Sequence, residues 1–278
     1  MFFNLFRKNP VAASDDMTFL QHLEALRWHL MRASIVVILI SIAAFFQKEW
    51  LFDTVLFGPK KADFPTYKFM CWLAEKLSID DLCISEISFK LQSTEMSQQF
   101  TLHMWVAFYA GLVMSFPYVL WELWRFIKPA LSVKEKQYTT GVVFVSSLLF
   151  FLGVLFGYYV IAPLSINFLG SYSVSTEVQN IFTIDSFISI ITMLTLATGV
   201  VFQLPILVFF LAKIGLLTPG FMRAYRKHAL VVILIIAAVI TPSPDVTSQI
   251  LVALPLYALY EISIGIAALV VSRSNAKK

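Results

Sequence analysis

Charged residues are scarce in this chain: they make up 14% of its 278 residues, whereas hydrophobic residues make up 59%. A soluble domain needs more charge than this to cover its surface, so the composition excludes an ordinary water-soluble protein and indicates one solvated by lipid. The formal net charge of +4 does not indicate a nucleic-acid-binding protein. The basic residues stand in short clusters between apolar runs, which is the distribution that membrane orientation requires.

Six apolar runs predict an all-α polytopic membrane protein with six transmembrane helices. A helix needs about 20 predominantly apolar residues to cross the hydrocarbon core, and the runs cover residues 30–46, 105–124, 141–162, 187–212, 229–240 and 250–271. Pro163 is expected to end the third helix, and Pro205 to kink the fourth. The fifth run is short enough for a re-entrant segment, but we favour a short span because it gives a consistent charge distribution.

The positive charges predict which side of the membrane each connection faces. Lys and Arg cluster before the first run, after the second and fourth runs and in the tail, and they are absent from the connections after the third and fifth runs. Both termini are therefore predicted to be cytoplasmic. The resulting layout is a cytoplasmic segment 1–29 that contains an amphipathic surface helix, a membrane domain 30–271 and a cytoplasmic tail 272–278. Residues 1–18 lack an apolar stretch of the signal-peptide type, so the first run is expected to remain as an anchor.

The connection 47–100 is long and polar, with six Lys and eight acidic residues, so the charge rule applies to it weakly. It contains both cysteines of the chain, Cys71 and Cys83. In the predicted topology these cysteines face an oxidising periplasm, where a disulfide between them is possible. Two unrelated thiols are the alternative.

Four segments of the chain carry recognisable motifs. They read His-Leu-Glu-Ala-Leu-Arg at 22–27, Trp-Arg-Phe-Ile-Lys-Pro-Ala-Leu at 124–131, Thr-Pro-Ser-Pro-Asp-Val-Thr-Ser-Gln at 241–249 and Pro-Leu-Tyr-Ala-Leu-Tyr-Glu at 255–261. Together they resemble, in order and in membrane position, the motifs of the TatC family of the twin-arginine protein export system. The resemblance covers residues from about 19 to 269. It implies a receptor subunit of the bacterial inner membrane that self-associates, works with TatA and TatB, and binds twin-arginine signal peptides of folded proteins for export driven by the proton-motive force.

The resemblance also implies where the signal peptide binds. A pair of guanidinium groups needs carboxylates near the headgroup level, where charge-assisted bidentate hydrogen bonds are strong. The family's pattern assigns one carboxylate to Glu135, with Phe126 as its apolar neighbour, and it places Arg27 in the N-terminal motif. The family's second carboxylate aligns with Ala25. Glu24 is one position earlier, about 100° around the helix, so either Glu24 or another acid takes that role.

Other polar residues are candidates for contacts with partner helices. Gln203 stands where the family tends to carry an acid, and it is expected to contact a partner's transmembrane helix. Glu261 lies in an apolar run and has either a structural or a partner-contact role. Thr241, Asp245 and Gln249 surround a turn broken by proline, where they are expected to satisfy freed backbone groups near a docking site for TatA or TatB.

Two other classes of protein are less consistent with the sequence. A secondary transporter needs ionisable residues that converge near the midplane and two related halves, whereas we identify only Gln203 and Glu261 inside the spans. An enzyme needs a convergent catalytic set, and the four histidines lie near span ends without the spacing of metal ligands; they are His22, His29, His103 and His228. We therefore expect no catalysis, no metal and no cofactor.

Overall fold

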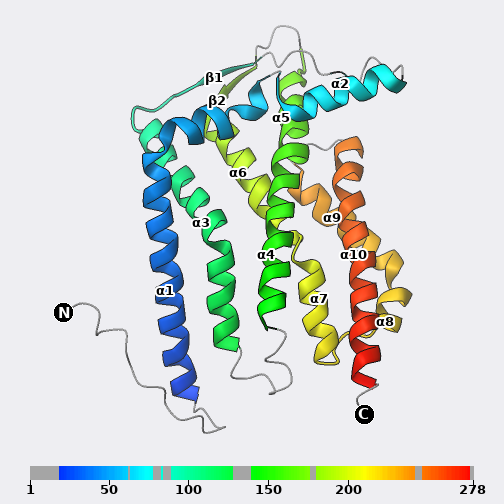
Figure 1. The fold of residues 1–278 in the computed structure, drawn as a ribbon. Coiled ribbons are helices and arrows are strands. Elements are labelled where there is room, and N and C mark those ends of the chain that lie inside the picture. The colour runs from blue at the N-terminus through cyan, green and yellow to red at the C-terminus, as the bar shows by residue number, and fades with distance from the viewer. Residues whose placement is uncertain are drawn as a thin grey trace, which may run out of the picture.

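The computed structural model describes residues 19–61, 63–77, 83, 89–127, 139–175, 180–241 and 246–275. Most of these residues lie in helices, and the longest helices run side by side (Figure 1). Five segments are long and apolar enough to cross a membrane: His22–Phe46, Gln98–Ile127, Gly141–Ser171, Ile184–Lys213 and Val252–Ser272. They coincide with five of the six predicted runs. The remaining run lies in the shorter helix α9 (Arg226–Ile240), so a sixth span stays a prediction.

The two ends of this helical body differ. Helix α1 (Phe19–Phe46) begins at one end, where α3 (Gln98–Ile127) and α10 (Val246–Asn275) finish; we call this the terminal end (Figure 1). The opposite end, called the sheet end, carries the turns η2 (Trp50–Leu56) and η3 (Gly58–Lys60), the crosswise helix α2 (Pro65–Leu77) and two short strands. Apart from the second strand, these segments belong to the predicted 47–100 connection.

Two short strands add a small sheet to this mostly helical fold. Strand β1 (Lys90–Gln92) pairs in parallel with β2 (Ile181–Thr183), and Leu91 lies opposite Phe182. The pair joins the first connection of the chain to the connection before the fourth apolar run. Strands of three residues are too short to show an alternating pattern, which is why the sequence did not reveal them.

The first apolar run is longer than the sequence suggested. Helix α1 is continuous from Phe19 to Phe46, so the N-terminal motif extends the first span along its own axis (Figure 1). Among the described residues no separate helix precedes the first span, and the position of these first turns at the membrane surface stays a prediction. The segment contains neither glycine nor proline, so no residue in it favours a break.

The third span also continues past its predicted end. Helix α4 (Thr139–Phe156) passes through a π-helical turn, η7 (Gly157–Ile161), into α5 (Ala162–Ser171). The sequence predicted that Pro163 ends this helix. Instead, Pro163 lies at the start of α5, and the helix continues past it. Because α5 continues directly from η7, the missing N–H of Pro163 leaves the Tyr159 carbonyl without its α-helical donor.

The fourth span is divided as predicted. Helix α6 (Ile184–Val201) stops before Gln203, and α7 (Leu204–Lys213) restarts with Pro205 in its first turn. A short helix, α8 (Pro219–Ala224), then leads into α9 and α10. Thr218 caps α8 by accepting a hydrogen bond from the backbone N–H of Phe221 at 3.2 Å.

Close packing between α4 and α6 depends on glycine. A Cβ atom on Gly153 would lie 2.8 Å from the carbonyl oxygen of Thr198, and one on Gly157 would lie 3.0 Å from that of Leu194. Gly199 faces them from α6 and contacts Phe150. The Gly-x-x-x-Gly spacing of this span thus serves helix packing.

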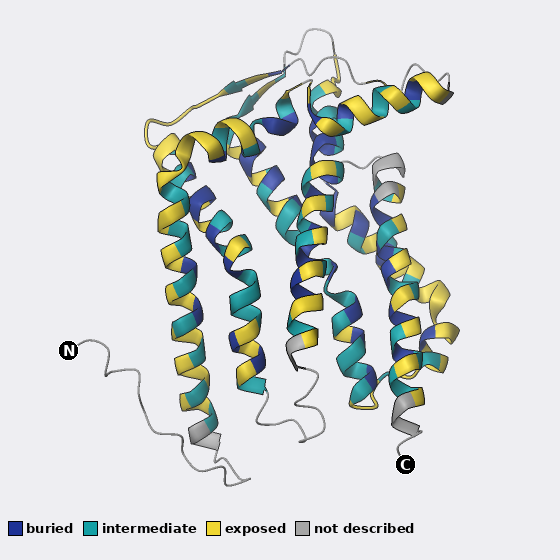
Figure 2. Ribbon diagram, viewed as in Figure 1, coloured by how far each residue is buried: buried dark blue, intermediate teal, exposed yellow. Residues whose placement is uncertain are grey.

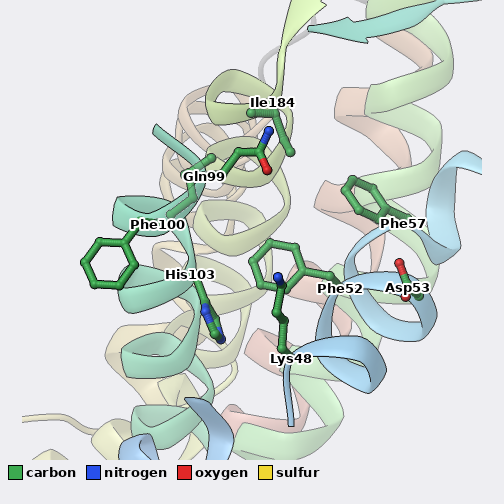
Figure 3. Close-up of a pocket in the computed structure, with 9 residues that line it drawn as sticks. Lys48, Phe52, Asp53, Phe57, Gln99, Phe100, His103 and Ile184 are labelled. Atoms are coloured by element: carbon green, nitrogen blue, oxygen red, sulfur yellow. The ribbon is translucent and has the colours of Figure 1, made fainter. Parts of the chain in front are cut away.

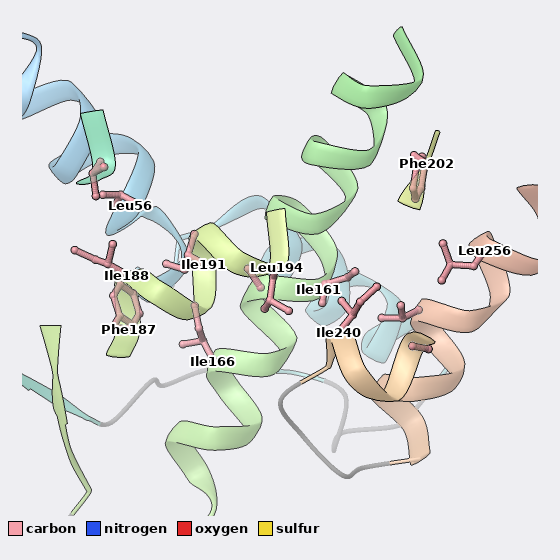
Figure 4. Close-up of a cluster of buried hydrophobic side chains, with 14 of the residues drawn as sticks. Leu56, Ile161, Ile166, Phe187, Ile188, Ile191, Leu194, Phe202, Ile240 and Leu256 are labelled. Atoms are coloured by element: carbon pink, nitrogen blue, oxygen red, sulfur yellow. The ribbon is translucent and has the colours of Figure 1, made fainter. Parts of the chain in front are cut away.

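The main core lies where α5, α6, α9 and α10 meet beneath the turns of the sheet end (Figure 4). Its residues include Ile161, Ile191, Leu194, Ile240 and Leu256, each of which is buried. Exposed positions follow the outer surfaces of the long helices (Figure 2). Many of these exposed residues are large and apolar, including Leu39, Phe144 and Leu254, as expected for helices surrounded by lipid.

Candidate functional site

The N-terminal motif and the motif after the second span meet at the terminal end. His22 of α1 stacks on Phe126 of α3, with ring centres 4.3 Å apart. His29, two turns further along α1, approaches the same ring edge-on at 6.2 Å. Residues seven apart share one face of a helix, so both histidines face the end of α3. This contact joins the two segments that the family resemblance identified as the signal-peptide site.

A buried carboxylate lies next to this contact. Glu122 is 1% exposed, and among the residues whose exposure the structure describes it is the one charged side chain that is buried. His29 Nδ1 and Glu122 Oε2 share a hydrogen bond. Tyr118 donates its hydroxyl hydrogen to Glu122 Oε1 at 3.1 Å, and Arg125 Nη1 donates to the same oxygen at 3.4 Å.

The sequence reasoning overlooked Glu122 when it placed only Gln203 and Glu261 inside the spans. The predicted second span, 105–124, contains this glutamate one helical turn before Phe126. The presence of an acid in an apolar run was the signal that could have identified it. His29 was also passed over, because a histidine on an interfacial helix is unremarkable until its partner is known.

The remaining residues of the predicted peptide site are only partly described. Glu24 and Arg27 are exposed on α1, and Ala25 is half-buried. Glu135 lies outside the described residues, as does Asp245 of the partner-contact group. The structure thus brings Phe126 to α1 and leaves the roles of Glu24 and Glu135 as predictions.

Gln203 has partners within the chain. Its Nε2 donates to the carbonyl oxygen of Ser146 on α4 at 3.0 Å, and its Oε1 accepts a hydrogen bond from the Ser146 hydroxyl. The amide therefore links the break between α6 and α7 to α4. Contact with a partner helix stays a prediction, and such a contact would have to use another part of the side chain or displace this pair.

Thr241 and Gln249 both donate hydrogen bonds to backbone carbonyls of α9. The Thr241 hydroxyl donates to the carbonyl oxygen of Ala237 at 2.9 Å at the end of α9. Gln249 Nε2 donates to the carbonyl oxygen of Leu234 at 3.0 Å and so ties α10 to α9. Their contact with partner subunits stays a prediction.

Glu261 forms an ion pair inside the chain. Arg226 Nη2, at the start of α9, donates to Glu261 Oε2 at 2.7 Å, and the Tyr257 hydroxyl donates to Oε1 at 3.1 Å. Both charged side chains are partly exposed, at 46% for Arg226 and 34% for Glu261. The pair therefore fixes the start of α9 against α10 and leaves an accessible edge.

A pocket of about 360 Å³ lies at the sheet end between η2 and the start of α3 (Figure 3). Lys48, Asp53, Gln99 and His103 supply its polar lining, together with several phenylalanines. His103 Nε2 lies 3.0 Å from the carbonyl oxygen of Phe45. The pocket is at the opposite end from the His22–Phe126 contact, so it is not part of that site.

The sheet end is cross-linked by a disulfide and by buried hydrogen bonds. Cys71 of α2 is bonded to Cys83. The hydroxyl of Tyr67, which is 1% exposed, donates to the carbonyl oxygens of Pro59 at 2.7 Å and Pro163 at 3.2 Å. Within the described ranges, no group of three or more His, Cys, Asp or Glu residues could hold a metal ion.

The family model of the Sec-independent protein translocase protein TatC matches residues 21–255. The chain belongs to the TatC family. It is 38% identical over 255 residues to TatC of Blattabacterium sp. subsp. Periplaneta americana (strain BPLAN), which covers 91% of this chain and 96% of that protein. It is 33% identical to TatC of Koribacter versatilis (strain Ellin345) over 266 residues, or 96% and 90% of the two chains.

Solved structures agree with this assignment. A crystal structure of the twin arginine translocase receptor TatC is similar to this chain, with a TM-score of 0.64 and 29% sequence identity. The similarity covers 90% of this chain and 99% of that structure. A second crystal structure of that receptor, in DDM, gives a TM-score of 0.67 and 30% identity over 88% of this chain and 99% of the other. As a TatC-family member, the chain is a multi-pass membrane subunit of the Sec-independent protein translocase and works in a complex with other Tat subunits.

Proposed function

We propose that this chain is the receptor of a twin-arginine translocation system in the bacterial inner membrane. It binds twin-arginine signal peptides of folded proteins at its cytoplasmic face. Together with TatB-type and TatA-type single-span proteins, it passes those proteins across the membrane at the expense of the proton-motive force. The chain catalyses no reaction of its own and uses no cofactor in this function.

The observation that carries the proposal is the contact between His22 and Phe126, with ring centres 4.3 Å apart. It places the N-terminal motif beside the helix end that leads into the segment containing Glu135. A guanidinium pair bound there would find carboxylate oxygens and an aromatic surface within one short stretch of the terminal end. Charge-assisted hydrogen bonds of this kind are worth about 1.5–3 kcal/mol each.

The proposal includes a topology of six spans with both termini in the cytoplasm. Arg27, Arg125, Lys213 and Arg226 lie near the terminal-end limits of their helices, and such basic ends face the cytoplasm. Helix α9 would be the fifth span. It has 15 residues and reaches about 22 Å, so it needs local thinning of the bilayer or cover from neighbouring helices. The corresponding layout is segment 1–29, membrane domain 30–271 and tail 272–278.

The partner contacts are proposed for residues near the helix breaks and for Glu261 in the middle of α10. Gln203, Thr241, Asp245, Gln249 and Glu261 are the candidates, since polar groups at broken helices can exchange internal bonds for bonds to another helix. The accessible edge of the Arg226–Glu261 pair supports Glu261 as a residue that a partner helix can reach.

An export assay tests the function directly. In a strain that lacks this gene, plasmid-borne wild type should restore export of a folded reporter that carries an Arg-Arg leader, but not of one that carries Lys-Lys. Glu135→Ala should abolish photo-crosslinking of the Arg-Arg leader, because one guanidinium would lose its carboxylate. Equal export of the two reporters by the wild type would refute the proposal, and unchanged crosslinking of Glu135→Ala would refute that residue's role.

A second variant tests the N-terminal motif. Ala25→Glu should preserve or strengthen leader capture, because it adds a carboxylate one position from Glu24 on the helix that contacts Phe126. Loss of export in this variant would mean that the site here is arranged differently from the family pattern.

A further inference from the structure

A guanidinium already rests against a carboxylate and an aromatic ring at the terminal end of α3. Arg125 Nη1 donates to Glu122 Oε1 at 3.4 Å, and the guanidinium carbon lies 4.7 Å from the centre of the Trp121 ring. Carboxylate oxygens and aromatic faces are the two kinds of group that bind a planar guanidinium well. These two residues therefore form a site whose chemistry suits any arginine, including one supplied from outside the chain.

The two partners in this site differ in how firmly they are held. The Glu122 side chain is 2% exposed, whereas that of Arg125 is 44% exposed. Glu122 is fixed by His29 from α1 and by the Tyr118 hydroxyl one turn earlier on α3. The carboxylate can therefore stay in place while its half-exposed cation is exchanged. Replacing one guanidinium by another also avoids leaving a buried charge unpaired, which is the costly outcome.

The site lies beside the proposed signal-peptide surface. Glu122 and Phe126 are one turn apart on the same face of α3, and His22 and His29 of α1 contact this face. The N-terminal motif carries Ala25 where the family pattern has a carboxylate. Glu122 supplies a carboxylate to the same helix contact from the opposite side.

We propose that Trp121 and Glu122 form a guanidinium-binding subsite that takes one arginine of the signal peptide, and that Arg125 occupies this subsite until the peptide displaces it. This inference rests on the proposed receptor function and supplies the second carboxylate that the function needs. The displaced Arg125 reaches outward to water or lipid headgroups, as its long side chain allows. A lysine leader competes poorly, because an ammonium cannot match the planar stacking and paired donors of a guanidinium.

Binding of fluorescent synthetic leaders to the full-length protein in detergent tests the inference. The leaders are a matched pair that differ only in Arg-Arg against Lys-Lys. Arg125→Met, which keeps an apolar stem but removes the resident guanidinium, should tighten Arg-Arg binding by about tenfold. Arg223→Met, which alters an exposed arginine on α8, is the matched control and should leave binding unchanged. Arg125→Lys replaces the resident by a weaker occupant and should tighten binding by a smaller factor, which covers the case in which the Met variant does not fold.

Glu122→Gln provides the opposite test. It keeps the shape of the side chain, and it should lower Arg-Arg binding by about tenfold or more while Lys-Lys binding hardly changes. An equal loss for both leaders would indicate a purely structural role and would overturn the inference. Arg-Arg affinity that is unchanged or weaker in both Arg125 variants would also overturn it.

The same measurements separate failure of the inference from failure of the proposed function. If the wild type shows no preference for Arg-Arg over Lys-Lys, the receptor function fails. If the wild type discriminates and Glu135→Ala abolishes that preference, but Glu122→Gln does not change it, then only the subsite is wrong.

Discussion

The Thr66 hydroxyl donates a hydrogen bond to the backbone carbonyl oxygen of Tyr159, across the junction between α2 and the third span. In a regular α-helix this carbonyl would accept from the residue four positions later, which is Pro163 and has no N–H. A side chain from the 47–100 connection therefore serves a backbone group for which the helix has no α-helical donor. This bond explains how the helix can continue through a proline.

Removing this hydroxyl should weaken the sheet end. Thr66→Val keeps the size and shape of the side chain but leaves the Tyr159 carbonyl without the Thr66 donor, so we expect a loss of about 0.5–1.5 kcal/mol in the free energy of unfolding. Thermal unfolding in detergent measures the change. Thr66→Ser keeps the donor and should unfold close to the wild-type temperature; a Thr66→Val variant as stable as the wild type would show that the hydrogen bond does not stabilise this end.

The hydroxyl of Tyr67 predicts a loss of stability at high pH. Burial raises the pKa of Tyr67 above its ordinary value of about 10. In the pH range above 10 the unfolded chain loses this proton while the folded protein still holds it, so the stabilisation present below pH 10 decreases as the pH rises toward the folded-state pKa. Tyr67→Phe should be less stable than the wild type at pH 8, because the carbonyls of Pro59 and Pro163 lose a donor.

The measurement for Tyr67 is the difference in unfolding temperature between wild type and Tyr67→Phe across pH 8 to 11. This difference should shrink above pH 10, since the variant has no phenol to ionise at this position. A difference that stays constant with pH would contradict the prediction.

Gly153 should tolerate no side chain. A Cβ there would lie 2.8 Å from the Thr198 carbonyl oxygen and 2.9 Å from the Gly199 Cα, so Gly153→Ala must push α4 away from α6. We expect a destabilisation of about 1–3 kcal/mol, measured by unfolding in detergent. Gly141→Ala in the same helix is the control, because a Cβ there meets nothing within 4 Å and alanine favours the helix. Similar losses at both positions would show that helix contact is not the cause.

Gln203 and Ser146 should behave as a coupled pair. Gln203→Leu leaves the buried Ser146 hydroxyl without its Gln203 acceptor and should cost about 1–3 kcal/mol. Adding Ser146→Ala should recover part of that loss, because both polar partners are then gone. A double-mutant cycle of unfolding free energies measures the coupling. If Gln203 also contacts a partner helix, co-purification of that partner should fall in Gln203→Leu and stay low in the double variant.

The bond between Cys71 and Cys83 predicts a simple chemical result. Protein isolated without reductant and unfolded in denaturant should gain no mass from a thiol-alkylating reagent, and it should gain two adducts after reduction. Mass spectrometry of the intact chain reads this directly. Two adducts without prior reduction would contradict the bond.

The sequence predicted those parts of the fold that depend on apolar length and on helix-breaking residues. Five apolar runs became helices long enough to cross a membrane, and the break near Pro205 followed from its missing N–H. The same rule failed at Pro163, because the donor that compensates for it is a side chain from a distant segment. The strand pair was missed for a similar reason, since each strand is defined by its partner and not by its own pattern.

The candidate site was predictable only as separate segments. The motifs located Phe126 and the N-terminal helix, but their contact through His22 depends on how α1 packs along α3. Glu122 was overlooked because the significance of a carboxylate in an apolar run depends on its partners. Those partners, His29 and Tyr118, are ordinary residues at span ends until the two helices are placed together.

The parallel pairing of β1 with β2 has a consequence for biosynthesis. The disulfide closes over 12 residues of sequence and can form as soon as residues 71–83 have been made. Strand β1, by contrast, has no partner until α3, α4 and α5 have been made and inserted. The sheet end is therefore completed in two stages: a local cross-link forms early, and the strands join only after the third span is in place. The 47–100 connection must stay soluble in the interval, and its six Lys and eight acidic residues favour this.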